Sequence, residues 1–389
     1  MAEFVSHRPL LRRISVPFTR SGGKYRPPRL VRENFGQRLR RALEELGPTF
    51  IKLGQILSDR ADIIPESVVL EMKKLQDEVP PFPTVEAKRI VSESLGYPLD
   101  ELFLYFYDEP EGAASLAQVH RAILPTGKPV AVKIKRPGID EQIEADLQIM
   151  RQFAGFVDSY TSYFETLSAQ DIIEEFEMQI RKELDFVEEF LSVRKFAADY
   201  ENDDTVIVPE VYDRYTTHDV LVQEFIHGQK VSEIIENPSD RFDTKRINLR
   251  TADFIMSQLF INGYFHADPH PGNFLVLEGD VICFIDFGMV YSLRPYEQDN
   301  LNLMMIGLAR LDPGLVARSL LRMGYAEGKV DEARFESVVY DYIEEHLNRP
   351  LEYIDIPSAF MSLLQTVVRF GIRLPPRLIY VAKVLGSMQ

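Results

Sequence analysis

The chain has 389 residues, 45% of them hydrophobic, enough for one large core or two medium ones. Its formal net charge of −16 argues against a nucleic-acid partner, whose phosphates the body of the protein would repel. The single cysteine, Cys283, can form no internal disulfide, which favours a reducing, intracellular compartment. No stretch has the roughly 18–20 apolar residues needed to cross a bilayer, so an integral membrane protein is not expected.

Residues 1–37 are predicted to form a basic N-terminal arm. The first 41 residues contain eleven Lys or Arg but only two acids, so the negative charge lies in the rest of the chain. Apolar residues such as Leu10, Leu11 and Phe18 are mixed with these bases. This composition is typical of a segment that binds an anionic membrane surface, and equally of a solvated tail.

Residues 38–79 are predicted to form a helical extension. Leucine and isoleucine recur near a 3.6-residue period from Arg38 to Ile64, and Gly47-Pro48 marks a break. The segment Lys52-Leu53-Gly54-Gln55 lies inside this pattern. Clustered prolines at 80–83 then indicate a linker.

Residues 80–226 and 227–389 are predicted to form two lobes. The first contains a β-hairpin over 116–135, helices over 140–200, and strands over 206–211 and 220–226. The second is mainly helical, with two short strands within 274–285. Strands followed by helices predict an α+β fold with two lobes.

The strongest motif runs from His266 to Asn273 and is followed by Asp286-Phe287-Gly288. Its spacing matches the catalytic loop H-x-D-x-x-x-x-N and the D-F-G of protein kinases. Transfer of a γ-phosphoryl group needs a carboxylate near the acceptor and oxygen ligands for Mg²⁺. Asp268 is therefore predicted to be catalytic, and Asn273 and Asp286 to bind the metal beside ATP.

Two other readings of this motif are weaker. His266 and His270 have the i, i+4 spacing of helical zinc ligands, but the prolines at 269 and 271 forbid that helix. A polar loop with a capping aspartate would not explain the full Asp, Asn and Asp spacing.

Lys133 ends the strand sequence Val130-Ala131-Val132-Lys133, close to the V-A-I-K of kinases, whose lysine reaches the α- and β-phosphates. Such a lysine needs a carboxylate, which we expect from a helix between the strands. The candidates are Glu183, Asp185, Glu188 and Glu189. The strand over 220–226 would be the hinge, where the backbone at Glu224 and Ile226 would meet adenine.

Together these residues resemble the UbiB/AarF family of atypical protein-kinase-like proteins. Three features carry the resemblance: the K-x-G-Q of residues 52–55, the stretch Gly112-Ala113-Ala114-Ser115 in place of a glycine-rich loop, and the E-x-D of residues 183–185. The family has a bilobal protein-kinase-like fold with an added helical N-terminal extension. It uses ATP and Mg²⁺, and the 112–115 loop would contact the nucleotide.

The resemblance also implies pairings. Lys52 would pair with Glu183 and block protein substrates, while Gln55 and Asp185 would lie near the phosphates. Glu189 would pair with Lys133, so that two lysines meet two acids of one helix. Gly112 departs from the family's alanine. Many relatives have a hydrophobic C-terminal segment, so an end at Gln389 suggests a partial sequence.

The function implied by the resemblance is a lipid-coupled ATPase that supports ubiquinone or prenylquinone biosynthesis. Its partners would be prenyl lipid or quinone intermediates, quinone-biosynthesis enzymes and a membrane surface, on the bacterial cytoplasmic side or in an organelle. A small-molecule phosphotransferase of the choline or aminoglycoside kinase type is one alternative. A nucleotide-sensing scaffold for biosynthetic enzymes is another.

Overall fold

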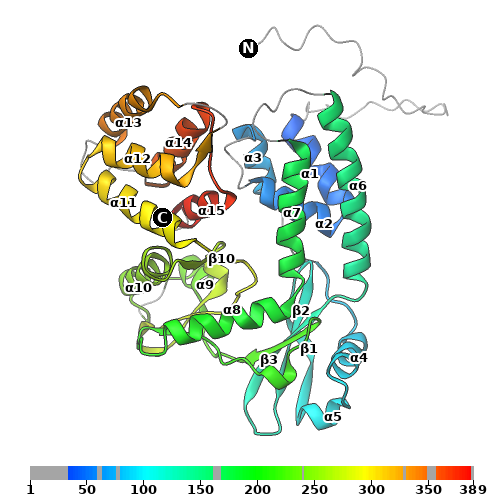
Figure 1. Cartoon of the computed structure of the whole chain (residues 1–389). Helices are drawn as coiled ribbons and strands as arrows, with labels where there is room; N and C mark the ends of the chain where they lie inside the picture. Colours follow the sequence, from blue (N-terminus) through cyan, green and yellow to red (C-terminus); the bar gives the residue numbers. More distant parts are fainter. Residues whose placement is uncertain are drawn as a thin grey trace, which may run out of the picture.

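A computed structural model describes residues 34–58, 64–75, 79–160, 168–238, 241–326, 330–347 and 356–386. It confirms the expected α+β fold with two lobes and a helical extension (Figure 1). Most of the basic arm and the last three residues lie outside the described part of the chain.

The extension comprises α1 (Phe35–Leu46), α2 (Pro48–Ser58) and α3 (Glu66–Met72). α1 begins three residues before the predicted start because Asn34 and Gln37 form a capping box, which satisfies backbone donors at the helix N-terminus. The predicted break is present at Gly47, whose φ of 105° ends α1.

Two long helices, α6 (Ile139–Tyr160) and α7 (Ala169–Glu183), stand beside this extension. They share one apolar core with it, which includes Leu53, Met72, Leu147 and Phe176. The helices that the sequence assigns to the first lobe therefore pack with the extension as well. The exact domain limits stay a prediction.

A four-stranded antiparallel sheet forms the first lobe, in the order β1 (Tyr105–Ala113), β2 (Ala117–Ile123), β3 (Pro129–Lys135) and β5 (Val220–Glu224). In β3, Val130, Val132 and Ile134 are fully buried with residues of α4 (Thr84–Leu95) and α5 (Leu99–Leu102). Strand alternation then places Lys133 on the opposite face. The predicted hairpin is confirmed, although β1 was not predicted.

Helix α8 (Phe186–Asp199) packs on that opposite face, where Phe186 and Phe190 contact the sheet residues Ala117 and Leu221. The short strand β4 (Val206–Ile207) follows α8 and pairs with β9 (Ile282–Phe284) of the second lobe. The sheet of the first lobe therefore has α4 and α5 on one face and α8 on the other.

The second lobe combines three small sheets with a set of helices. Its further strands are β6 (Gln229–Lys230), β7 (Tyr264–His266), β8 (Phe274–Val276), β10 (Val290–Ser292), β11 (Tyr325–Ala326) and β12 (Ile372–Arg373). Its helices are α9 (Val231–Glu236), α10 (Thr244–Ser257), α11 (Pro295–Ala309), α12 (Pro313–Met323), α13 (Glu332–His346), α14 (Ile356–Arg369) and α15 (Pro376–Gly386). The two strands predicted within 274–285 are confirmed as β8 and β9.

None of the helices in the described ranges combines the length and the apolar character that a membrane span requires.

Candidate active site

Two of the small sheets of the second lobe bring the predicted catalytic loop beside the D-F-G segment. Strands β8 and β9 pair Phe274 with Phe284, and the N–H of Ile285 donates to the carbonyl of Asn273 over 3.0 Å. Strands β7 and β10 pair His266 with Val290. As a result Asp268, Asn273 and Asp286 lie at neighbouring strand ends.

Lys133 forms a buried ion pair with Glu189. Its Nζ lies 2.7 Å from Oε2 and 3.0 Å from Oε1 of that carboxylate, whose side chain is only 3% exposed. Nζ is also 3.8 Å from Oδ1 of Asp286. Among the four acids that the sequence offered, Glu189 is therefore the partner of Lys133.

Charge in this cluster is set by burial and by opposite charges. Burial alone would lower the pKa of Lys133, but Glu189 and Asp286 outweigh it and raise that pKa above its ordinary value. Burial would likewise raise the pKa of Asp286, yet Lys133 holds it below its ordinary value. Both groups stay charged near neutral pH, and 44% of the Asp286 side chain is exposed to solvent.

Lys52 of α2 makes a second ion pair, which is partly buried. Its Nζ lies 2.6 Å from Oε1 of Glu183, with the two side chains 12% and 20% exposed. The two pairs meet at Gly288, where a Cβ atom would lie within 4 Å of Glu183, Glu189 and Asp286. The extension therefore inserts a lysine into the cluster that holds Lys133.

The two acids lie on two helices, which corrects the expectation of one. Glu183 ends α7, whereas Glu189 is in the first turns of α8. Asp185 separates them as the N-cap of α8, accepting from the N–H of Val187. A capping aspartate stabilises a helix start but breaks the preceding helix, because its backbone is extended.

The side chains of Asp185 and Gln55 contact residues outside the two lysine–glutamate pairs. A carboxylate oxygen of Asp185 lies 2.8 Å from Nδ1 of His218. Nε2 of Gln55 donates to the carbonyl of Leu75 over 3.5 Å, a long hydrogen bond within the extension. The predicted position of both side chains near the phosphates stays a prediction.

The stretch from Gly112 to Ser115 forms the tip of the β1–β2 hairpin. The N–H of Ala114 donates to the carbonyl of Ala117 over 2.8 Å, and Arg136 donates to the carbonyl of Ala114 over 2.7 Å. Ser115 Oγ is buried and has no hydrogen-bond partner in the described part of the chain. A Cβ atom on Gly112 would meet nothing within 4 Å, so the alanine of the family would fit there.

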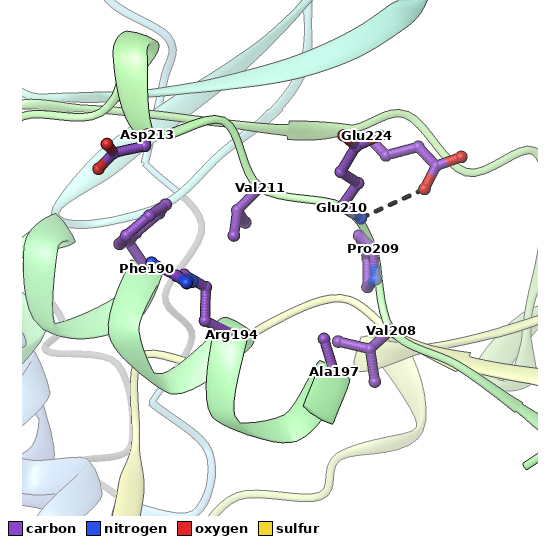
Figure 2. Close-up of a pocket in the computed structure, with 9 residues that line it drawn as sticks. All are labelled: Phe190, Arg194, Ala197, Val208, Pro209, Glu210, Val211, Asp213 and Glu224. Carbon is purple, nitrogen blue, oxygen red and sulfur yellow. Dashed lines mark hydrogen bonds between the residues drawn. The ribbon is translucent and has the colours of Figure 1, made fainter. Parts of the chain in front are cut away.

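Glu224, at the end of β5, turns its side chain away from Lys133. Its Oε2 accepts from the N–H of Glu210 over 3.2 Å (Figure 2). There it lines a cavity of about 590 Å³ between α8 and the segment over 208–213. Phe190 and Arg194 of α8 face this cavity, whereas Glu189 faces Lys133. Neither Lys133 nor Glu189 lines this cavity, so the Glu224 side chain lies outside the lysine cluster. The hinge role of the backbone at Glu224 and Ile226 stays a prediction.

Two further lysines contact the site and were missed in the sequence. Lys182 donates to the carbonyl of Val290, just after the D-F-G segment. Lys383 of α15 lies 3.1 Å from Asp268. Neither lysine belongs to a recognisable motif. Lys383 is also distant in sequence from Asp268, so no local spacing could have identified this contact.

The residues present fit a magnesium–nucleotide complex better than a metal site made by protein alone. In the described ranges, no three His, Cys, Asp or Glu side chains gather to hold a metal ion. Mg²⁺ commonly takes one or two carboxylates and completes its shell with waters and phosphate oxygens. Asp286, with Asn273 at the neighbouring strand end, is such an incomplete set.

His266 is a buried neutral imidazole behind the catalytic loop. Its Nδ1 accepts from the N–H of Asp268 over 3.1 Å, and its ring packs edge-on against Phe284. Burial lowers the pKa of His266 to about 4. An imidazole free in the unfolded chain binds a proton near pH 6.5, so acid favours the unfolded state.

We expect this histidine to make the protein acid-sensitive between pH 6.5 and 4. The folded protein loses about 2 kcal/mol from this group between pH 7 and pH 5, since the unfolded state binds the extra proton. Urea unfolding at pH 7 and at pH 5 measures this loss in the free energy of unfolding. His266→Asn keeps an acceptor for the N–H of Asp268 but cannot titrate, so it should lose less stability. Equal losses in both proteins would contradict this assignment.

Known proteins resemble this chain in sequence. Residues 74–320 match the model of the ABC1 atypical kinase-like domain. The chain is 35% identical over 366 residues to the "Probable protein kinase UbiB" of Marinobacter nauticus and to that of Cellvibrio japonicus. Each match covers 93% of this chain and 66% of the relative, so the chain spans less than two thirds of their length.

A solved structure is also similar. It is the complex of Rv3197 with erythromycin from Mycobacterium tuberculosis, 25% identical, with a TM-score of 0.55, covering 89% of this chain and 92% of that one. This similarity supports the bilobal kinase-like fold expected from the sequence. The chain therefore belongs to the ABC1 atypical kinase-like family, which includes the UbiB proteins.

Proposed function

We propose that this protein is an Mg²⁺-dependent ATPase of the atypical kinase type that supports ubiquinone or another prenylquinone synthesis at a membrane surface. The observation that carries the proposal is the charge cluster in which Lys133 pairs with Glu189 beside Asp286. Phosphoryl-transfer enzymes of this fold use such a lysine on the phosphates and such an aspartate on the metal.

Each residue has a role in this scheme. Glu189 holds the Lys133 ammonium at the site, where it would meet the α- and β-phosphates. Asp286 and Asn273 would hold Mg²⁺, which neutralises charge on the phosphates when bound. The hairpin tip from Gly112 to Ser115 would cover the nucleotide, and the hinge backbone at Glu224 and Ile226 would receive adenine.

Asp268 would orient water as the acceptor. As the water oxygen bonds to the γ-phosphorus, the bond from that phosphorus to the bridging oxygen breaks and its electron pair leaves with ADP. The proton of the water passes to the Asp268 carboxylate and then to solvent. The 43% exposure of the Asp268 side chain supports access for water.

Lys52 would exclude a protein acceptor. It comes from the extension and is paired over 2.6 Å with Glu183, which lies near Glu189 and Asp286 around Gly288. A peptide entering this site would have to displace this partly buried ion pair, which would leave its charges uncompensated. Turnover to water does not require that displacement.

The lipid part of the proposal rests on the family resemblance. The basic, partly apolar arm over residues 1–37 has the composition of a segment that binds an anionic membrane surface. We propose peripheral attachment there, on the bacterial cytoplasmic side or within an organelle, with prenyl lipid or quinone intermediates and quinone-biosynthesis enzymes as partners.

Two substitutions separate the metal role from the catalytic role. Asp286→Asn should weaken Mg²⁺-ATP binding about tenfold or more, because a charged ligand is lost. Asp268→Asn should leave binding intact and lower turnover by about 10²–10⁴-fold. Calorimetric titration and phosphate release measure the two effects. Equal affinity in the wild type and Asp286→Asn would refute the metal assignment.

Removing Lys52 tests the exclusion of protein acceptors. Lys52→Ala should produce autophosphorylation, detected with radiolabelled ATP, because the Glu183 pair no longer fills the site. Lys74→Ala is the matched control, since Lys74 lies in the same extension but pairs with Glu71 and is 58% exposed. If neither variant incorporates phosphate, Lys52 does not block protein substrates here.

Lipid coupling predicts that ATP hydrolysis rises with anionic liposomes and a phenolic prenylquinone-precursor analogue, and that Asp268→Asn shows no such rise. Phosphate release by the purified protein measures this. Unchanged hydrolysis together with phosphate on a small alcohol would favour the choline or aminoglycoside kinase type. Nucleotide binding without turnover under any condition would favour the scaffold.

A further inference from the structure

Helix α15 brings a cation to the predicted catalytic carboxylate. Nζ of Lys383 lies 3.1 Å from Oδ1 of Asp268. The Lys383 side chain is 26% exposed and that of Asp268 is 43% exposed, so the pair is partly open to solvent. Figure 1 shows α15, in red, in the middle of the molecule between the second lobe and the helices around α7.

The helix that carries Lys383 is a fixed part of the fold. Val381 is fully buried, and Leu378, Val384 and Leu385 are no more than 2% exposed in the core of the second lobe. Tyr380 packs its ring on Tyr291, with ring centroids 4.5 Å apart. A helix anchored in a core holds its polar face in one place, so Lys383 is preorganised beside Asp268.

Tyr380 also connects α15 to α7. Its hydroxyl donates to Oε1 of Gln179 over 3.0 Å. Tyr291, on which the Tyr380 ring stacks, belongs to β10, which follows the D-F-G segment. The position of Lys383 is thus tied both to the second lobe and to the helix that ends at Glu183.

The neighbouring charges explain why a cation is needed at this place. His266 is buried and neutral, and His270 is used as a cap that accepts from the N–H of Gly272. Lys133 is paired with Glu189. Asp268 would otherwise face Asp286 and the nucleotide phosphates as one more negative group, and like charges at close range repel strongly where water is scarce.

We propose that Lys383 is a positioning residue for phosphoryl transfer. It holds Oδ1 of Asp268, which leaves Oδ2 for the proton of the acceptor, and its charge offsets the repulsion between this carboxylate and the phosphates. This inference rests on the proposed ATPase function. It adds a C-terminal helix to the active site and gives that helix a role distinct from that of Lys52.

The test compares three variants of the full chain. Lys383→Met should lower kcat for ATP hydrolysis about 10²-fold, the usual effect of a misplaced catalytic group. Mg²⁺-ADP affinity should change by less than about twofold, since Lys383 acts on Asp268 and not on the α- and β-phosphates. Lys383→Arg should recover at least about a tenth of the wild-type kcat. Arg322→Met removes an exposed cation of the same lobe and should change neither quantity.

A double variant provides the second readout. Asp268→Asn with Lys383→Met should be no slower than Asp268→Asn alone, because Lys383 acts through Asp268. Multiplied losses would contradict the inference, as would a Lys383→Met variant that turns over like Arg322→Met or faster than the wild type. Loss of Mg²⁺-ADP binding in both Lys383 variants would reduce Lys383 to a structural role.

The same set of variants distinguishes a failure of this inference from a failure of the proposed function. A wild-type protein without ATP hydrolysis, or hydrolysis unaffected by Asp268→Asn, would contradict the ATPase function itself. Hydrolysis that requires Asp268 but not Lys383 would overturn only the role of Lys383.

Discussion

The rest of the site depends on the buried pair between Lys133 and Glu189. A buried ammonium without its carboxylate is expensive, so this contact fixes α8 against the open face of the sheet. Nζ of Lys133 also lies 3.8 Å from Oδ1 of Asp286 in the neighbouring lobe. Its positive charge keeps the Asp286 carboxylate ionised. One interaction thus positions α8 and sets the electrostatics of the proposed phosphate site.

A second pair adds the extension to this arrangement. The contact of Lys52 with Glu183 lies close enough to the first pair that both share the space around Gly288. The helix break at Asp185 makes this possible, because it lets Glu183 and Glu189 approach the cluster from two helices with different directions. The proposed preference for water over protein acceptors follows from that shared space.

Local patterns in the sequence predicted much of the fold and part of the site. The hairpin carrying Lys133 has clear alternation and turn residues, and the β8–β9 pair beside Asp286 consists of two apolar runs around a turn. The pairings of Lys52 and Glu189 came from the family resemblance. The break at Asp185 was missed because its cap depends on a backbone conformation that the acidic run conceals. Lys383 was missed because its contact with Asp268 depends on how α15 packs in the core, which no local spacing records.

The most direct test of the central claim is a structure of this protein with Mg²⁺ and a non-hydrolysable ATP analogue. We expect the metal on Asp286 and Asn273, and Lys133 on the α- and β-phosphates while still paired with Glu189. Lys52 should remain on Glu183. Nucleotide bound elsewhere, for example in the cavity lined by Phe190 and Arg194, or a metal without contact to Asp286, would contradict it.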